Sequence, residues 1–321
     1  MRKFLLAGSV ACFAVLLAIA LMWPRSTRPP HGNGEIAFEQ VDQGNRNAIA
    51  TVNPDGSGVE TLLDQSLECP HWSPDGSRIA VCGGASDVAT TILTVDTGAV
   101  ATWPSPDPTL SMECFVWSPT GKRLACSSDN EIQPRHNGIY TVRASDGEGM
   151  RRVTSAPAGS DVPASYSRNG KRLAFVRFHD HRPVGLFVVD LDGTGLRRIT
   201  PRGALIYGNS MGDWSRQGIV FAMRAQPETR ASIWVIRPGG TGLREIDFGS
   251  DVPCGGRVVD PTSRGCFDPT WSPDGRELAF VVTEPGRSEA RVFAANADGG
   301  EVIAVTGGDS RYPDWGPHPL N

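Results

Sequence analysis

The sequence predicts an all-β fold, and within that class a six-bladed β-propeller of four-stranded blades. Three observations predict it: a phrase that recurs six times, a second turn after each copy, and complementary half-blades at the two ends. The clearest copies of the phrase are His71–Val81 and Thr270–Phe280, which both contain Trp-Ser-Pro-Asp-Gly before an apolar run. A unit repeated at near-regular spacing indicates one supersecondary element stacked along the chain.

Aromatic residues spaced 44 to 57 positions apart anchor the six copies. These anchors are Trp72, Trp117, Tyr166, Trp214, Trp271 and Trp315. In the clearest copies, proline presets φ at the first turn position and glycine accepts the positive φ that closes the turn. The segment that ends at the anchor and the apolar run after the turn are therefore expected to be strands a and b.

A second hairpin completes each unit. Its turns lie at Asp55-Gly56, Thr97-Gly98, Asp146-Gly147, Asp192-Gly193, Gly239-Gly240 and Asp298-Gly299. Asp-Gly between β-rich runs is among the stronger short-range signals for a hairpin, so these turns are expected to join strands c and d. Four antiparallel strands at this period are typical of a propeller blade.

The two ends of the repeat region complement each other. The N-terminal part supplies strands b, c and d near residues 35–38, 49–52 and 59–62, whereas residues 312–315 form a lone strand a. We expect the C-terminal strand a to join the N-terminal strands b, c and d in one blade. That arrangement would close the ring and cover two otherwise unpaired strand edges.

The repeated phrase and its second hairpin resemble the PD40 (WD40-like) repeat of TolB-type six-bladed propellers. The resemblance covers roughly residues 34–318. TolB proteins carry a separate N-terminal α/β domain before the propeller, whereas here only residues 24–34 separate the apolar N-terminal segment from the first strand. The resemblance therefore implies the propeller part and not whole TolB, and it does not carry over a role in the Tol–Pal system.

The N-terminal segment has the features of an export signal. Residues 4–22 contain no charged side chain and follow Arg2 and Lys3. As a helix they would span about 28 Å, close to the thickness of a bilayer core. We expect a signal-anchor helix or signal peptide over residues 1–23, a short linker over 24–33 and the propeller over 34–321. Trp23 favours a retained anchor with its N-terminus inside, whereas cleavage near Ala20 would release the protein.

Charge and cysteine usage agree with an extracytoplasmic location. After residue 30 the chain has 27 basic and 35 acidic side chains, a balance that argues against nucleic acid as a partner. Six cysteines form three neighbouring pairs, and the expected disulfides are Cys69–Cys82, Cys114–Cys126 and Cys254–Cys266. The second pair is one residue out of hairpin register and needs a β-bulge or another partner. Buried free thiols remain the alternative for the first two pairs.

Three motifs resemble catalytic or metal-binding motifs, but each lacks part of what that chemistry requires. Gly208–Gly212 matches the Gly-x-Ser-x-Gly elbow but lacks the strand–turn–helix setting that the elbow requires. Asp190–Gly193 lacks the later acid of a calcium loop. His179 and His181 could contribute to a metal site, but no third ligand is evident. We therefore predict no catalytic residue, cofactor or metal.

Binding residues are expected on loops and at the mouths of the channel. Eight residues form the candidate surface because they precede an anchor, follow a strand or lie in the insertion before the fifth anchor. They are His71, Asp213, Asp314, His179, His181, Arg257, Asp260 and Arg264.

The sequence favours an exported, membrane-anchored propeller that acts as a non-catalytic scaffold for a protein or cell-envelope component. The alternative is a propeller enzyme or glycan-binding protein of the lactonase or lyase type, with its site at the mouth of the channel. That alternative requires several carboxylates or histidines that converge at one mouth. A third hypothesis, a sensor domain, would need another membrane protein to carry the signal.

Overall fold

The computed structural model describes residues 33–316 except 43, 45, 66, 84–88, 108, 131, 208–211, 251, 257–264 and 285–288. Residues 31–321 form one compact unit. The predicted signal segment lies outside the described residues. Within the described part of the chain, no helix is both long enough and apolar enough to cross a membrane.

The regular secondary structure of the described chain is β-strand, apart from one short 3₁₀-helix, η1 (Pro134–His136). Four sheets each have four strands, and in each of them sequence neighbours pair antiparallel. In the order of pairing, the first sheet has β25 (Ser310–Trp315), β1 (Ile36–Val41), β2 (Asn47–Val52) and β3 (Glu60–Leu63), and the second has β4 (Glu68–Trp72), β5 (Arg78–Cys82), β6 (Ala89–Thr94) and β7 (Ala99–Pro104). The third sheet has β8 (Met112–Trp117), β9 (Arg123–Ser128), β10 (Gly138–Arg143) and β11 (Arg151–Arg152). The fourth sheet has β12 (Gly159–Tyr166), β13 (Arg172–His179), β14 (Arg182–Asp190) and β15 (Arg197–Arg198).

A fifth sheet contains nine strands, so the prediction of six separate four-stranded blades is not met as stated. Its strands are β16 (Leu205–Ile206), β17 (Asp213–Ser215), β18 (Gly218–Arg224), β19 (Ala231–Ile236), β20 (Arg244–Glu245), β21 (Gly265–Trp271), β22 (Glu277–Thr283), β23 (Ala290–Asn296) and β24 (Ile303–Ala304). One parallel pairing, Ala231 with Gly265, joins β19 to β21. This approach requires glycine, because a Cβ at position 265 would lie 2.3 Å from the Ala231 carbonyl oxygen.

The first sheet combines the two ends of the described chain. β25 pairs antiparallel with β1 and places Trp315 opposite Ile36 and Asp314 opposite Ala37. β1 pairs in turn with β2, and β2 with β3. The predicted C-terminal strand a therefore lies beside the predicted N-terminal strands b, c and d.

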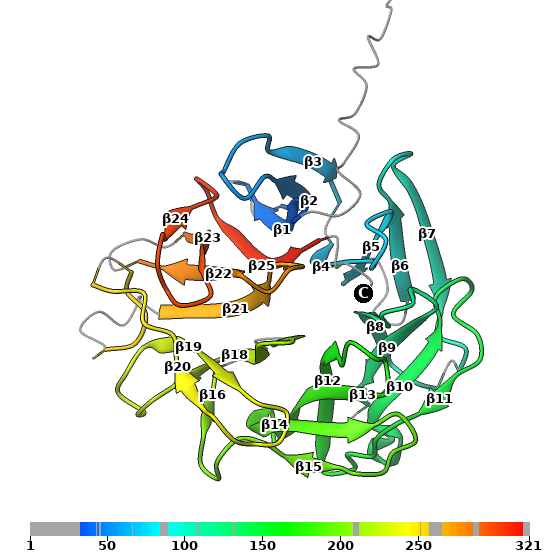
Figure 1. Ribbon diagram of the computed structural model, residues 1–321. Coiled ribbons are helices and arrows are strands. Elements are labelled where there is room, and N and C mark those ends of the chain that lie inside the picture. Colours follow the sequence, from blue (N-terminus) through cyan, green and yellow to red (C-terminus); the bar gives the residue numbers. More distant parts are fainter. Residues whose placement is uncertain are drawn as a thin grey trace, which may run out of the picture. The chain divides into compact units, whose positions relative to one another are not determined.

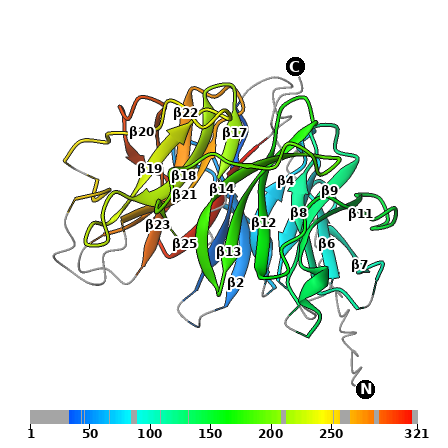
Figure 2. The same cartoon turned by 90° about the horizontal axis from the view of Figure 1, so that it is seen from below.

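The sheets are arranged around a common centre, with β4, β8, β12, β21 and β25 on the inner side (Figure 1). Figure 2 shows the same arrangement from the side, where the long strands β12 and β13 extend from one face toward the other. Apolar clusters lie between neighbouring sheets, and one of them combines Ala37 and Ile49 with Trp72 and Ile79. The anchors therefore pack the sheets against one another.

The turns after Trp72, Trp117, Tyr166 and Trp271 share one pattern of backbone hydrogen bonds. In the first copy the Ser73 amide donates to the carbonyl of Arg78 (2.8 Å), and the Gly76 amide donates to the carbonyl of Ser73 (2.9 Å). Asp75 accepts hydrogen bonds from the hydroxyls of Ser73 and Ser77. The same pair of backbone bonds recurs after Ser118, Ser167 and Ser272. The phrase is therefore a turn that starts a hairpin at the end of each inner strand.

Candidate functional site

A cavity of about 780 Å³ lies where the inner strands end at their anchors, and we call it the anchor-side cavity. Its wall consists of the first five anchors, the Ser-Pro turns after them and the residues before them. All the sheets with inner strands that end at an anchor contribute to it, so the repeated phrase builds one composite surface.

His71, Asp213 and Asp314 all line the anchor-side cavity. The sequence hypothesis placed these three residues at a channel mouth because each directly precedes an anchor. Their role in binding a ligand stays a prediction, and their hydrogen bonds point to a structural role as well.

The two carboxylates connect inner strands of successive repeats, and the bond of Asp314 also joins two different sheets. Oδ2 of Asp213 accepts the backbone N–H of Trp271 (3.0 Å), and Oδ2 of Asp314 accepts the backbone N–H of Trp72 (2.7 Å). Between these two steps, Oγ1 of Thr270 accepts the backbone N–H of Trp315 (3.4 Å). The residue before one anchor therefore holds the next anchor around the ring. The sequence analysis did not predict these hydrogen bonds to the next anchor. The only signal for them was the position of the residue directly before an anchor.

Two other residues that directly precede an anchor, Ser165 and His71, also make contacts in the cavity wall, but through different groups. The Ser165 hydroxyl donates to Oδ1 of Asp213 (2.9 Å). The Trp117 indole N–H donates to the carbonyl of His71 (2.9 Å), and the His71 ring stacks on Phe115 with 5.2 Å between ring centroids. These contacts fix the wall of the cavity before any ligand arrives, which lowers the ordering cost of binding.

Two buried donors in the wall have no hydrogen-bond partner among the described residues. They are the hydroxyl of Tyr166, a residue that is 5% exposed, and the indole N–H of Trp271. Burial raises the pKa of the Tyr166 hydroxyl, so this group keeps its proton near neutral pH. Arg168 and Arg216 are exposed residues of the same wall. The cavity therefore offers hydrogen-bond donors and aromatic surface.

A second cavity, of about 440 Å³, lies where the inner strands begin, and we call it the loop-side cavity. Its wall contains the start of β4, β8 and β12 and the end of β5 and β13. Its lining residues are Glu68, Cys69, Cys82, Gly83, Glu113, Phe115, Ser127, Asp129, Ser160, Val162, Phe178, His181 and Tyr312. Tyr312 lines both cavities, so it lies at the boundary between them.

The structure does not bring the other predicted surface residues together. His181 lines the loop-side cavity, whereas His179 is exposed at the end of β13 and lies 3.6 Å from the Asp180 carboxylate. Arg257, Asp260 and Arg264 lie outside the described residues. Within the described ranges, no group of three histidine, cysteine or acidic side chains could hold a metal ion.

Three inner strands share a backbone feature that sequence reasoning missed. Cys69, Asp268 and Tyr312 each lie three residues before an anchor and directly before a proline, and their φ angles are 41°, 49° and 49°. Positive φ is unfavourable for these residue types, and a following proline restricts them further. The pairing registers shift at the same places. These β-bulges redirect side chains at the cavity walls.

Two buried acids lie near the boundary of the cavities. Burial raises the pKa of Glu39 to about 7, an effect that Glu68, Asp309 and Asp268 strengthen and Arg311 opposes. Burial likewise raises the pKa of Asp268 to about 7, again opposed by Arg311. Burial raises the pKa of Tyr312 to about 12, and the nearby carboxylates add to that shift.

All three expected disulfides are present: Cys69–Cys82, Cys114–Cys126 and Cys254–Cys266. The alternative of free thiols is therefore wrong for the first two pairs. Cys114 lies directly opposite Cys126, and the register shifts between Cys114 and Val116. This shift is the bulge that the second pair required.

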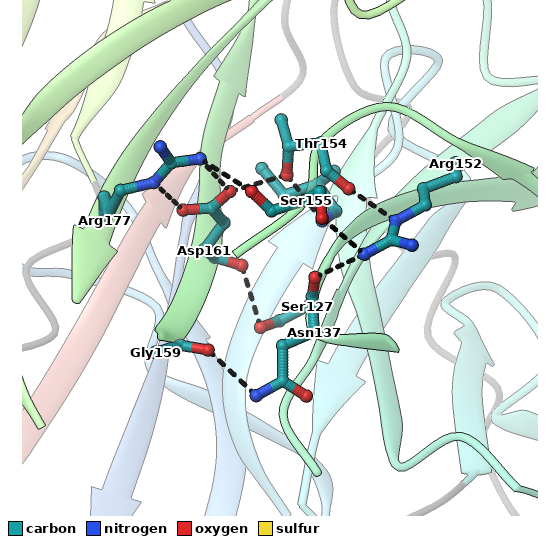
Figure 3. Close-up of polar contacts among 9 residues, drawn as sticks. Ser127, Asn137, Arg152, Thr154, Ser155, Gly159, Asp161 and Arg177 are labelled. Atoms are coloured by element: carbon teal, nitrogen blue, oxygen red, sulfur yellow. Dashed lines mark hydrogen bonds and ion pairs between the residues drawn. The ribbon is translucent and has the colours of Figure 1, made fainter. Parts of the chain in front are cut away.

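A buried polar network joins the sheets of β9–β10 and β12–β13 (Figure 3). Asp161 is fully buried, and its carboxylate accepts two hydrogen bonds from the Arg177 guanidinium (2.7 and 2.8 Å) and one from the Thr154 hydroxyl (2.6 Å). The Ser127 hydroxyl donates to the Asp161 carbonyl (3.0 Å), and the Asn137 amide donates to the carbonyl of Gly159 (2.9 Å). The network satisfies a buried charge and fixes two neighbouring sheets.

Comparison with known proteins supports the fold. No family model matches the chain. In sequence, 87 residues (26% of the chain) are 36% identical to the Tol-Pal system protein TolB 1 of Novosphingobium aromaticivorans. The match spans only 16% of that relative.

Solved structures extend the likeness over most of the chain. TolB from Acinetobacter baumannii matches with a TM-score of 0.67 at 18% identity, over 88% of this chain and 66% of that one. A putative TolB from Agrobacterium tumefaciens gives a TM-score of 0.61 at 19% identity, over 86% of this chain and 91% of that one. An oligogalacturonate lyase from Vibrio parahaemolyticus gives 0.53 at 11% identity, over 84% and 78%. At these identities the likeness concerns the fold: the chain carries a TolB-like β-propeller.

Proposed function

We propose that the protein is an extracytoplasmic six-bladed β-propeller that binds a protein or cell-envelope component without catalysing a reaction. In this proposal the nine-stranded sheet comprises two blades, β16–β20 and β21–β24, joined by the single pairing at Gly265. The pairing of β25 with β1 closes the ring. The hydrogen bond from Trp72 to Asp314 supports this closure, because it repeats across the two ends the contact that Asp213 makes with Trp271.

The proposed layout has an export segment at residues 1–23, a linker at 24–33 and the propeller at 34–321. The N-terminal helix either anchors the protein in the membrane with its N-terminus inside or is cleaved near Ala20. Three disulfides support export, because such bonds persist in oxidising compartments. A phosphatase fused after residue 321 is expected to be active only when export occurs, and inactive fusions at normal protein levels would overturn this localisation.

The anchor-side cavity is the observation that carries the binding proposal. It combines about 780 Å³ of space with aromatic walls, and in those walls the Tyr166 hydroxyl and the Trp271 indole N–H have no hydrogen-bond partner among the described residues. Meanwhile the carboxylates of Asp213 and Asp314 accept backbone hydrogen bonds from the inner strand of the next repeat. A rigid wall with donors and aromatic surface suits recognition of a ligand rich in carbonyl or other acceptor groups.

The proposal is tested by blocking the cavity with a side chain that the fold tolerates. Thr120 is an exposed turn residue of the cavity wall, and Thr97 is an exposed turn residue outside that wall. We expect Thr120→Trp to abolish the cross-linked capture of one stoichiometric partner from the protein's own cells, whereas Thr97→Trp retains it. Purified components should reproduce the difference. Equal capture by both variants would contradict this use of the cavity.

A catalytic or glycan-binding propeller is the alternative function. The fold likeness to an oligogalacturonate lyase favours it, and so does the shared location of His71, Asp213 and Asp314 in one cavity. The variant Asp213→Asn distinguishes the two functions, because it keeps a hydrogen-bond acceptor for the Trp271 amide but removes the negative charge. Turnover of an oligosaccharide or lactone substrate that Asp213→Asn abolishes would establish the alternative.

A further inference from the structure

The outer strand β7 differs from the outer strands of the other sheets. All six of its residues pair with β6 on one side. The other outer strands are shorter: β3 has four residues, and β11, β15, β20 and β24 have two each. Among the described residues no strand pairs with the opposite side of β7, so β7 forms an open sheet edge at the periphery (Figure 1).

The side chains of β7 do not prevent pairing at this edge. Its sequence, Ala-Val-Ala-Thr-Trp-Pro, contains no charged residue, and its proline stands at the last position. Five of the six residues are exposed, and Val100 is 41% exposed. In contrast, β11 and β15 each consist of two arginines, and β20 consists of an arginine and a glutamate. Short length and charged side chains are common protections against edge pairing, and β7 has neither.

The open edge of β7 is held in place, and its outward backbone groups can be assigned. The Thr91 and Thr102 hydroxyls share a hydrogen bond of 3.2 Å. So close an approach is typical of a cross-strand pair whose backbone groups do not bond each other, so Thr102 directs its N–H and C=O outward. Val100, two residues earlier, has the same orientation. Trp103 packs against a turn of the next sheet, where a Cβ at Gly147 would lie 2.1 Å from a Trp103 ring carbon. The edge is therefore fixed before any pairing, which lowers the ordering cost of association.

We propose that β7 pairs antiparallel with β7 of a second copy of this chain, with Ala101 of each copy at a twofold axis. In this register Val100 of one copy lies opposite Thr102 of the other. The outward N–H and C=O groups of these two residues then bond one another, as they do in a hydrogen-bonded antiparallel pair. The sheet that contains β4 to β7 continues into the same sheet of the second copy.

A second copy is the occupant that the edge itself favours. Twofold symmetry uses the same patch on both partners, so an uncharged antiparallel edge is complementary to itself. Like charges opposite each other destabilise a strand pair, and self-pairing of β11 or β15 would bring arginines together. The residues of β7 line neither cavity, so this interface does not rest on the function proposed above.

The experiment is a photochemical cross-link in the protein's own cells. Two full-length copies with different tags are produced together, and one of them carries the photoreactive residue p-benzoylphenylalanine in place of Val100. We expect irradiation to give a covalent dimer that contains both tags. Mass spectrometry should place the cross-link within residues 99–104 of the second copy.

Charged variants at the proposed axis test the pairing. Ala101 is exposed, and either A101K or A101E would place two like charges opposite each other. Each variant alone should lower the yield of dimer at least ~10-fold, a change that corresponds to about 1.4 kcal/mol. A copy with A101K produced together with a copy with A101E should restore the dimer, because the charges are then opposite. This restoration would also show that both variants fold.

The matched control is T61K, at an exposed residue of the outer strand β3, and it should leave the yield unchanged. Three results would overturn the proposal. Irradiation gives no dimer with both tags, or it links position 100 to a different protein, or the combination of A101K with A101E yields as little dimer as either variant alone. An equal loss of dimer in T61K would likewise contradict an interface at β7.

Discussion

Asp161 and Glu39 are both buried carboxylates on strands near the loop-side cavity, but they differ in how fully their oxygens are hydrogen-bonded. Asp161 accepts three side-chain hydrogen bonds, two of them from the Arg177 guanidinium (Figure 3). The Oε2 atom of Glu39 has no hydrogen-bond partner in the described part of the chain, and the neighbouring cation Arg311 pairs with Asp309. The comparison teaches that burial alone does not give a carboxylate its role. A satisfied carboxylate fixes neighbouring sheets, whereas an unsatisfied one responds to protons and ligands.

The largest change in the free energy of unfolding is expected for a variant that removes the hydrogen-bonded carboxylate of Asp161. Asp161→Ala leaves the partly buried Arg177 guanidinium without its carboxylate, and we expect it to lower the free energy of unfolding by about 3–5 kcal/mol. Urea denaturation measures the change. A loss below about 1 kcal/mol, the value typical of surface pairs, would show that the network contributes little.

A smaller loss is expected at the contact between the two chain ends. Asp314→Ala removes the acceptor of the Trp72 amide at a side chain that is 8% exposed, which should cost about 2 kcal/mol. Asp213→Ala is the matched variant, and it should cost less because Asp213 is only half-buried. Thermal denaturation of both variants checks this order. A larger loss for Asp213→Ala would contradict the special importance of the closing contact.

Ionisation of the buried acids Glu39 and Asp268 should destabilise the fold, whereas the ionised carboxylate of Asp161 stabilises it. The pKa of Glu39 is about 7 in the folded protein against an ordinary value of 4.5, and that of Asp268 is about 7 against 3.8. The folded state therefore binds more protons than the unfolded state between these limits, so stability should fall as pH rises from about 4 to 7. Urea denaturation at several pH values measures this slope. Stability that rises throughout the window would contradict the raised pKa values.

The smallest effect is expected for Glu39→Gln at pH 8. This change removes an ionised carboxylate from a buried position and should raise the free energy of unfolding by about 1 kcal/mol. It should also flatten the slope between about pH 5 and 7. Glu148→Gln, at an exposed acid, is the control and should change neither quantity. A destabilised Glu39→Gln protein would indicate that the carboxylate has a stabilising partner.

The repeated phrase predicted the fold because its turn chemistry is local. Ser73, Asp75 and Gly76 make their hydrogen bonds within one turn, so their spacing in the sequence is sufficient evidence for a hairpin. The same holds for two of the disulfides, Cys69–Cys82 and Cys114–Cys126, which each cross one strand pair, including the bulge beside Cys114. Local rules therefore predicted the strands, the turns and the cysteine pairs.

The sites could not be predicted in the same way because they depend on neighbours distant in sequence. Asp314 contacts Trp72 across 242 positions, and this contact exists only once the sheets surround a common centre. The positive φ at Asp268 and Tyr312 depends on strand register, which the X-Pro pattern alone does not fix. Likewise, the single pairing at Gly265 that merges two predicted blades has no sequence signature beyond one glycine.

The most direct test of the account is a ¹³C NMR titration of the side-chain carboxyl groups of Glu39 and Asp268, with Glu39→Gln for assignment. We predict that both groups titrate near pH 7, because burial disfavours their ionised forms. Titration of both groups near pH 4 would contradict the account, since Glu39 would then be as well partnered as Asp161.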